Sequence, residues 1–269
     1  MDAWLIIYHY CMKGSFVMEI LLILFIMGCF LGFVGAGGAG VVIAILTVVF
    51  GIPIHVSLGT SLSAMAFTTL SGAYSHYREG NVVLKSGIAV GFFGAFGAFA
   101  GAKISAAIPG AQMHFLTGAI LYITAVLVYL KVFYPHSGIF SLISPHTLTR
   151  GKKFWLMAGI AGIFNGVLSG TFGIGATPFI QLTLMIFFGL SMIEAVGTTM
   201  LVILPIAVMG GFGYMTSGLL DFNLFVKVVI GLMAGAYIGA KFTRRANPML
   251  LKIAMVAVPI FGGTMLIFG

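Results

Sequence analysis

Long stretches with almost no charge dominate this chain and constrain its fold more than any other feature. Runs of roughly 20 apolar residues recur from Met18 to the C-terminus, and each is long enough to span the hydrocarbon core of a bilayer. Of the 269 residues, 61% are hydrophobic and 7% are charged, whereas soluble domains carry about 25% charged residues. Because backbone N–H and C=O groups find no water in lipid, such runs form helices. The sequence therefore predicts an all-α polytopic membrane protein.

An internal repeat fixes how the chain is organised. Shifting the sequence by 138 residues aligns it with itself without a gap, and the block GAFAGAK at 97–103 then meets GAYIGAK at 235–241. The same shift brings distant glycines into register: Gly28, Gly32, Gly35, Gly37, Gly51, Gly59, Gly72 and Gly80 fall on Gly166, Gly170, Gly173, Gly175, Gly189, Gly197, Gly210 and Gly218. We interpret this as a duplication. The chain divides into an N-terminal segment at 1–16, a first helical repeat at 17–133, a linker at 134–153 and a second helical repeat at 154–269.

Each repeat is expected to contain about five helical segments. We expect them at 17–35, 39–51, 56–77, 86–108 and 112–133, and again at 154–170, 174–189, 193–217, 222–243 and 248–268. The first two segments of each repeat are short and meet at glycines. They form either two thin crossings or a re-entrant hairpin, and both readings stay open. In either case each repeat crosses the membrane an odd number of times, so the two repeats have inverted topology.

The distribution of basic residues predicts the orientation. Ten of the 13 Lys and Arg residues fall in or beside the loops at 78–85, 131–153 and 241–252, which an odd number of crossings places on one side. Cytoplasmic loops carry an excess of Lys and Arg. We therefore expect the linker 134–153 in the cytoplasm and both termini, including the interfacial segment 1–16, outside it. The net charge of +8 is explained by this topology and predicts no nucleic-acid partner.

Glycine-broken helices at matching positions of inverted repeats indicate a transporter's binding site. The breaks here lie at Gly35, Gly37 and Gly38 in the first repeat and at Gly173 and Gly175 in the second. Free N–H groups at the start of a half-helix favour negative charge, and glycine lets an anion approach the backbone closely. The alternative is that these glycines only allow helices to pack closely. We favour that alternative for a different set, namely Gly97, Gly101, Gly235 and Gly239.

Polar side chains in the apolar segments supply further candidates for the binding site. Thr60 and Ser61 in the first repeat align with Thr198 and Thr199 in the second, and their hydroxyl groups suit an oxyanion that must shed water. The alternative is that these hydroxyls bond back to their own helix. Four polar residues surround the second break, and Asn165 is the preferred ligand contact among them: Asn165, Thr171, Thr177 and Gln181.

The ionisable residues of the chain indicate no catalytic function. His76 at a helix end is a candidate for proton coupling, with an interfacial histidine as the alternative. Glu194 and Asp221 lie at helix starts, where we expect them to act as caps. The sequence contains no metal-ligand spacing, no nucleophile motif and no phosphate-binding loop. It therefore predicts no enzyme, no cofactor and no bound metal.

The order of several motifs resembles the TauE/SafE family of sulfite-exporter-like permeases of the inner or plasma membrane. The motifs are GAGGAG at 35–40, GIPIHVSLGTS at 51–61, YSHYREGNV at 74–82 and GAFAGAK at 97–103. The resemblance implies transport of anionic sulfur compounds such as sulfite and organosulfonates, often as export. Carried over to this chain, it implies a binding role for nine residues: Gly35, Gly37, Gly38, Thr60, Ser61, Gly173, Gly175, Thr198 and Thr199.

We therefore predict a secondary transporter, an exporter of small sulfur-containing anions, with alternating access to a site near the bilayer midplane. Its partners are the anion and the bilayer, and a homo-oligomer is left open. Two alternatives stay open as well. The first is a passive anion channel of the same architecture, and the second is a membrane assembly factor that transports nothing.

Overall fold

The computed structural model describes residues 21–29, 39–134, 151–243 and 248–269, and this part of the chain is helical without any strand. The elements follow one another as α2 (Ala39–Ala44), the π-helical turn η1 (Ile45–Val49), α3 (Ile54–Arg78), α4 (Leu84–Ala107), α5 (Gly110–Phe133), α7 (Lys152–Phe172), α8 (Thr177–Phe188), α9 (Met192–Thr216), α10 (Phe222–Thr243) and α11 (Pro248–Phe268). Residues 21–29 are helical too. The expected all-α fold is confirmed.

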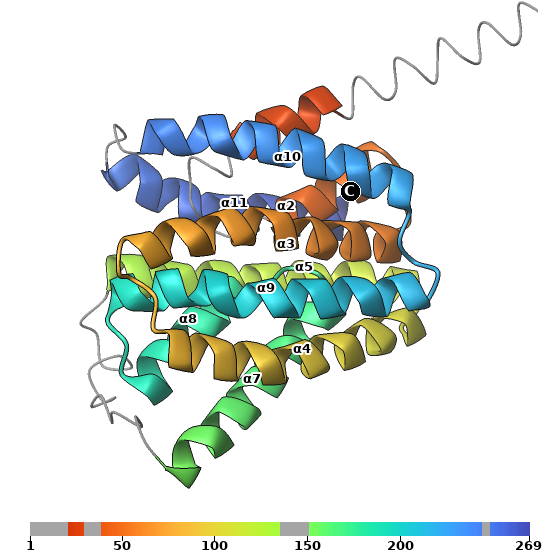
Figure 1. Cartoon of the computed structure of the whole chain (residues 1–269). Helices are drawn as coiled ribbons and strands as arrows, with labels where there is room; N and C mark the ends of the chain where they lie inside the picture. Colours follow the sequence, from red (N-terminus) through yellow and green to blue (C-terminus); the bar gives the residue numbers. More distant parts are fainter. Residues whose placement is uncertain (1–20, 30–38, 135–150, 244–247) are drawn as a thin grey trace, which may run out of the picture.

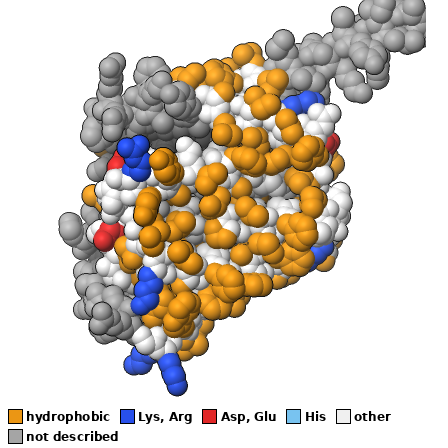
Figure 2. Space-filling model, viewed as in Figure 1, with side chains coloured by type: hydrophobic (Ala, Val, Ile, Leu, Met, Phe, Trp, Pro, Cys, Tyr) orange, Lys and Arg blue, Asp and Glu red, His pale blue; other side chains and the backbone are white. Residues whose placement is uncertain are grey.

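Four of the described helical stretches are long and apolar enough to cross a membrane. They are Leu84–Ala107, Gly110–Leu130, Lys152–Phe172 and Ile193–Thr216. Apolar side chains cover the middle of the face seen in Figure 2, and Lys and Arg side chains lie towards its edges. A water-exposed surface would carry many more charges. The molecule is built to be surrounded by lipid.

The helices of the two halves begin at matching positions. Four helices of the second half, α8 to α11, start 138 residues after their counterparts, which is the shift that aligns the sequence with itself. The pairs of first residues are Ala39 and Thr177, Ile54 and Met192, Leu84 and Phe222, and Gly110 and Pro248. Positive φ angles recur at the same shift, with 64° at Gly51 and 63° at Gly189. The two halves therefore share one plan of helices and turns.

The counterpart helices α3 and α9 lie side by side in opposite directions (Figure 1). Gly59 near the start of α3 packs against Tyr214 near the end of α9, and Gly197 near the start of α9 packs against His76 near the end of α3. These two contacts are related by the repeat, because His76 aligns with Tyr214 and Gly59 with Gly197. The two halves are therefore related by a pseudo-twofold axis that passes between α3 and α9.

Small residues bring helices of different halves into close contact. α4 and α7 run in the same direction, with Gly94 against Gly166 and Ala98 against Gly170. A Cβ atom at Gly97 would overlap the carbonyl oxygen of Ile163, so only glycine fits there. The repeat gives the same arrangement for α10 on residues 21–29, where a Cβ at Gly235 would overlap the carbonyl oxygen of Phe25. Close packing is thus confirmed for Gly97, Gly101 and Gly235; Gly239 lies outside the described side chains.

α7 and α8 form a hairpin. The rings of Phe154 at the start of α7 and Phe188 at the end of α8 have centroids 5.5 Å apart. Midway along the hairpin, Asn165 Nδ2 donates to Thr183 Oγ1 at 3.1 Å. The chain therefore enters at the Lys152 end, turns at 173–176 and returns to the end where it started. The expected segment 174–189 begins three residues later, at Thr177, because the turn consumes the residues before it.

Two acidic residues cap helices as the sequence indicated. Glu194 and Ser191 form a reciprocal capping box at the start of α9, in which the Glu194 carboxylate accepts from the Ser191 N–H at 2.8 Å. Asp221 Oδ1 accepts from the N–H groups of Asn223 and Leu224 at the start of α10. Both carboxylates are thereby committed to the first turn of a helix, where negative charge is favoured.

Candidate functional site

The turn between α7 and α8 has an unusual backbone. Gly173, Gly175 and Ala176 all have positive φ angles, of 64°, 68° and 44°. Ala176 is the one non-glycine residue of the described chain with a positive φ, and the left-handed region costs such a residue about 1–2 kcal/mol. Strain of this kind persists only where surrounding contacts impose it, and it concentrates at functional sites.

This turn leaves backbone N–H groups without partners. Gly173 N–H donates to Ser169 O at 2.8 Å and closes α7, and Ile180 N–H donates to Ala176 O at 3.0 Å within α8. Between these bonds, the N–H groups of Ile174, Gly175 and Ala176 donate to nothing in the described chain. Ile174 and Ala176 are buried, with exposed fractions of 4% and 0%. Most buried backbone N–H groups are paired, so this unpaired set marks the turn as a candidate binding site.

Three side chains of the α7–α8 hairpin also present unpartnered polar atoms. Thr177 Oγ1, Ser169 Oγ and Asn165 Oδ1 are buried and make no hydrogen bond with the described residues. Ser169 and Asn165 lie one and two turns before the end of α7, and Thr177 is the first residue of α8. We call these three side chains, together with the backbone of 173–176, the α7–α8 break site. It combines an acceptor with several donors and holds no formal charge.

The break site lies inside the helix bundle. Gly175 packs against Met65, at the middle of α3, with Met65 Sδ 2.8 Å from the position that a Cβ would take. Gly173 packs against Leu58, two turns nearer the start of α3. Asn165 lies at the depth of the middle of α4, since Gly94 faces the neighbouring Gly166. The site therefore extends from the centre of the bundle towards the end at which α3 begins.

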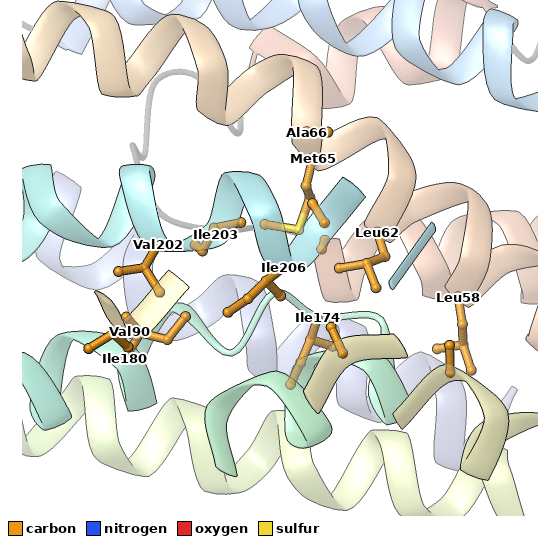
Figure 3. Close-up of a cluster of buried hydrophobic side chains, with 14 of the residues drawn as sticks. Leu58, Leu62, Met65, Ala66, Val90, Ile174, Ile180, Val202, Ile203 and Ile206 are labelled. Carbon is orange, nitrogen blue, oxygen red and sulfur yellow. The ribbon is translucent and has the colours of Figure 1, made fainter. Parts of the chain in front are cut away.

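Apolar side chains cover the break site on the α3 side. Leu62 and Met65 of α3 gather with Ile174 and with Ile206 of α9 (Figure 3). All four are buried, with Met65 the most exposed at 8%. In this arrangement Met65 and Leu58 block close approach to Gly175 and Gly173. Access to these glycines therefore requires movement of α3 or of these side chains.

The candidates of the first half are only partly described. Gly35, Gly37 and Gly38 lie outside the described residues. Ser61 Oγ donates to Ala39 O, at the first residue of α2, at 3.2 Å. Thr60 Oγ1 is buried without a partner among the described groups. Ser61 and Thr60 therefore remain predicted site residues, with Ser61 holding α3 against the start of α2.

Thr198 and Thr199 lie away from their counterparts. Thr198 Oγ1 accepts from the N–H of Val83 at 3.0 Å, which ties α9 to the start of α4. Thr199 Oγ1 donates back to Ala195 O at 2.6 Å in its own helix. Because α3 and α9 are antiparallel, Thr60 and Thr198 lie about 20 Å apart along the pair. The structure thus does not bring the two hydroxyl pairs together.

His76 lies near the end of α3 and packs against Gly197 of α9. Its Nδ1 is buried and has no partner among the described groups, while its ring is partly exposed. It is far from the α7–α8 break site, since Met65 marks that site eleven residues, or about 16 Å, earlier on α3. A role in proton coupling stays a prediction.

Two residues of this region were not identified as site residues from the sequence. Ser169 was not singled out, although it lies four residues after Asn165 and thus on the same face of α7. Tyr214 is fully buried, and its hydroxyl donates to the carbonyl oxygen of Gly170 at 2.8 Å while lying 2.9 Å from Ser105 Oγ. It stabilises the end of α7 just before the break. A lone tyrosine in an apolar run gives no sign of such a bond.

No group of three or more His, Cys, Asp or Glu side chains lies together in the described part of the chain, so it offers no metal centre there. Neutral donors and one neutral acceptor, enclosed by long apolar helices, define a polytopic membrane protein with a buried polar site. A buried site of this kind is a candidate for binding a solute.

Comparison with known proteins identifies the family. The family model described as Sulfite exporter TauE/SafE matches residues 20–266, and the chain belongs to this family of membrane transporters. It is not an enzyme. The chain is 51% identical over 251 residues to the "Probable membrane transporter protein YdhB" of Bacillus subtilis, covering 93% of this chain and 100% of the relative.

More distant relatives have similar descriptions. A "Probable membrane transporter protein" of Xylella fastidiosa is 25% identical over 244 residues, with 88% of this chain and 90% of the relative covered. The "Probable membrane transporter protein ORF9" of Sinorhizobium is 26% identical over 246 residues, with 90% of each chain covered. No solved structure matches this chain.

Proposed function

We propose that the protein is a secondary transporter that exports small sulfur-containing anions such as sulfite or organosulfonates. One observation carries the proposal: three buried N–H groups at 174–176 and the Thr177 hydroxyl have no partners in the described chain. Leaving such groups unpaired costs about 1–3 kcal/mol each. An oxyanion bound at this turn would accept hydrogen bonds from these groups, and it would carry its own charge into a site without formal charge.

The proposed class of substrate, sulfur-containing anions, rests on the family to which the chain belongs. Its description names a sulfite exporter, and the donors of the α7–α8 break site suit the oxygen atoms of sulfite and of sulfonates equally. Backbone N–H groups at the start of a helix attract anions because the helix dipole adds to the individual bonds. Thr177 and the backbone of 173–176 would make these contacts. Gly35, Gly37, Gly38, Thr60 and Ser61 would contribute from the first half.

Inverted repeats that cross the membrane are the architecture we propose. The antiparallel packing of α3 on its counterpart α9 supports it, because counterparts in opposite directions imply halves of opposite orientation. The α7–α8 hairpin, with both ends at the Lys152 end, supports a re-entrant pair that ends inside the bilayer. Irregular backbone at membrane depth is tolerated where it lines a cavity, and transporters place their sites at such breaks.

The orientation follows from the basic residues. Among the described residues, Arg78, Lys85, Lys131, Lys152 and Lys153 lie at the end of the bundle where α3 and α5 finish and α7 begins. Lys103 and Lys227 lie towards the opposite end. We place the first group in the cytoplasm of the cell by the positive-inside rule. The break site then opens towards the outside when Leu58 and Met65 move, and alternating access exposes it to the cytoplasm.

Flux of sulfite through the purified protein in liposomes tests this function. We expect the uptake of radiolabelled sulfite to saturate with concentration. Unlabelled sulfite on the opposite side should accelerate this uptake, because a carrier with bound substrate changes orientation faster than an empty carrier. Flux that rises linearly without such acceleration would indicate a channel instead. Absence of any flux of sulfite, sulfoacetate or taurine would contradict the proposal and favour an assembly factor.

A further inference from the structure

Tyr214 of α9 caps the end of α7 from outside that helix. The last carbonyl oxygens of a helix have no N–H partner within it. Tyr214 Oη donates to Gly170 O at 2.8 Å and lies 3.3 Å from Thr171 O and 2.9 Å from Ser105 Oγ of α4. Because a carbonyl oxygen can only accept, the single proton of the phenol serves Gly170 O, and Ser105 donates to the phenol. One side chain thus joins α9 and α4 to the end of α7.

Close packing holds the ring of Tyr214 in this place. Gly59 of α3 has no side chain, and a Cβ there would lie 2.8 Å from Tyr214 Cβ and Cγ. The preceding residue, Gly213, lies so near α4 that a Cβ would come within 2.7 Å of Ala102 Cβ. Tyr214 itself is fully buried. The helices around the ring therefore keep its hydroxyl at the end of α7.

The capped oxygen is the acceptor that Ile174 would use if α7 continued. In an α-helix the N–H of residue i donates to the C=O of residue i−4, so Ile174 N–H would donate to Gly170 O. That N–H group has no partner in the described chain. The missing bond depends on the backbone angles of residues 171–173, and Gly173 is the one that departs from the helix, with φ 64° and ψ 5°. Since glycine adopts left-handed and right-handed angles about equally well, a change at one residue would extend α7 and remove a donor from the break.

We propose that Tyr214 is a positioning residue that keeps the α7–α8 break open. Its hydroxyl occupies Gly170 O, so Ile174 N–H stays available to the anion. Without the hydroxyl, a longer α7 would pair both groups and would compete with the open break. The anion binds only the open form, so its apparent dissociation constant rises as that form becomes less populated. The part of this inference that concerns transport rests on the proposed function.

Tyr214→Phe tests the inference, because phenylalanine keeps the ring and removes the hydroxyl. Tyr122→Phe is the matched control, since it removes a hydroxyl that bonds to Thr264 Oγ1 at 2.7 Å between α5 and α11. The first measurement is hydrogen–deuterium exchange, resolved to single amides by fragmentation in a mass spectrometer. We expect the Ile174 amide to exchange several-fold more slowly in Tyr214→Phe than in the unmodified protein, because it gains a bond to Gly170 O. Loss of a merely structural contact would accelerate exchange along α7 instead.

Sulfite flux in liposomes is the second measurement. In Tyr214→Phe we expect the half-saturating concentration of sulfite to rise about tenfold, which corresponds to one hydrogen bond. The maximal rate per folded molecule should stay within about twofold, because saturating sulfite restores the open form. Tyr122→Phe should match the unmodified protein in both quantities.

Either measurement on Tyr214→Phe can overturn the inference. Exchange of the Ile174 amide that is unchanged or faster would do so, and so would an unchanged half-saturating concentration. If the unmodified protein moves no sulfite, the proposed function fails, and the exchange measurement still decides whether Tyr214 keeps the break open.

Gly173→Ala provides a second variant in case Tyr214→Phe does not fold. Alanine is disfavoured in the left-handed region, and its Cβ would lie 2.9 Å from Leu58 Cα. Both effects favour right-handed angles at residue 173, so the Ile174 amide should again exchange more slowly. Unchanged exchange in this variant would mean that no longer α7 competes with the break, and would also overturn the inference.

Discussion

At the scale of single residues, the left-handed turn at 173–176 explains why a glycine stands where an apolar helix would continue. The N–H of Gly173 ends α7 by donating to Ser169 O. Gly175, which packs against Met65, then reverses the chain direction. A helix that continued here would bond the N–H groups of 174–176 internally. The break releases them instead, inside the bundle, at the cost of strain at Ala176.

Gly175→Ala, compared with a matched control, distinguishes the cost of a positive φ angle from the effect of filling the space next to Met65. The matched control is Gly218→Ala, because Gly218 has nearly the same φ, 69° against 68°, but no atom within 4 Å of the added Cβ. Both variants should lose about 1–2 kcal/mol of stability, since alanine is disfavoured in the left-handed region. Sulfite flux per folded molecule should fall in Gly175→Ala alone.

Thermal unfolding in detergent measures the stability of the two variants, and flux in liposomes measures transport. Equal flux in both would mean that the space around Gly175 is not used by the solute. A much larger loss of stability in Gly218→Ala would contradict the assigned backbone conformations.

At the scale of helices, contacts between small residues hold the two halves together. α4 of the first half lies on α7 of the second along Gly94, Ala98, Gly166 and Gly170. In lipid there is no hydrophobic drive to bring helices together, so close backbone approach supplies much of the association. This packing also fixes the depth of Asn165 and thus of the break site.

Gly166→Ala should disrupt that packing. The added Cβ would overlap the carbonyl oxygen of Gly94 and lie 2.9 Å from the N atom of Ala98, so α4 and α7 must separate. Overpacking of this kind costs about 1–3 kcal/mol, which we expect as a lower midpoint of thermal unfolding. Gly159→Ala on the same helix is the control, with its nearest atom 4.0 Å away. The control should be neutral or stabilising, because alanine favours a helix; equal loss in both would refute the close contact.

The sequence predicted the helices well, and the residues of the binding site stay predictions. Periodic glycines and the 138-residue repeat located the helices to within a few residues, because long apolar runs in lipid have little choice but to be helical. The same repeat suggested that Thr198 would share a site with Thr60. Repeat alignment equates positions in two halves and says nothing of their distance, and antiparallel packing separates these two. Partners such as Val83 for Thr198 and Ala195 for Thr199 depend on packing that a sequence does not show.

At the scale of the whole molecule, the account predicts that repeat counterparts face opposite sides of the membrane. Lys85 at the start of α4 aligns with Asn223 at the start of α10, and both are exposed. With Cys11 and Cys29 replaced by serine, a membrane-impermeant thiol reagent added to intact cells should label Asn223→Cys. It should label Lys85→Cys only after the cells are permeabilised. Labelling of both from one side would contradict inverted repeats.

The central claim is that unpartnered donors at the α7–α8 break bind the transported anion. Thr177→Val tests it most directly, because valine keeps the shape of threonine and removes the one side-chain donor at the start of α8. Thr69→Val is the control, since the buried Thr69 hydroxyl donates back to Met65 O in its own helix at 2.7 Å. The measurement is the initial rate of radiolabelled sulfite flux in liposomes at equal amounts of folded protein. The account predicts a loss of about tenfold at low sulfite for Thr177→Val, as expected for one hydrogen bond to a charged group, and no loss for Thr69→Val. Equal rates in Thr177→Val and the unmodified protein would contradict it.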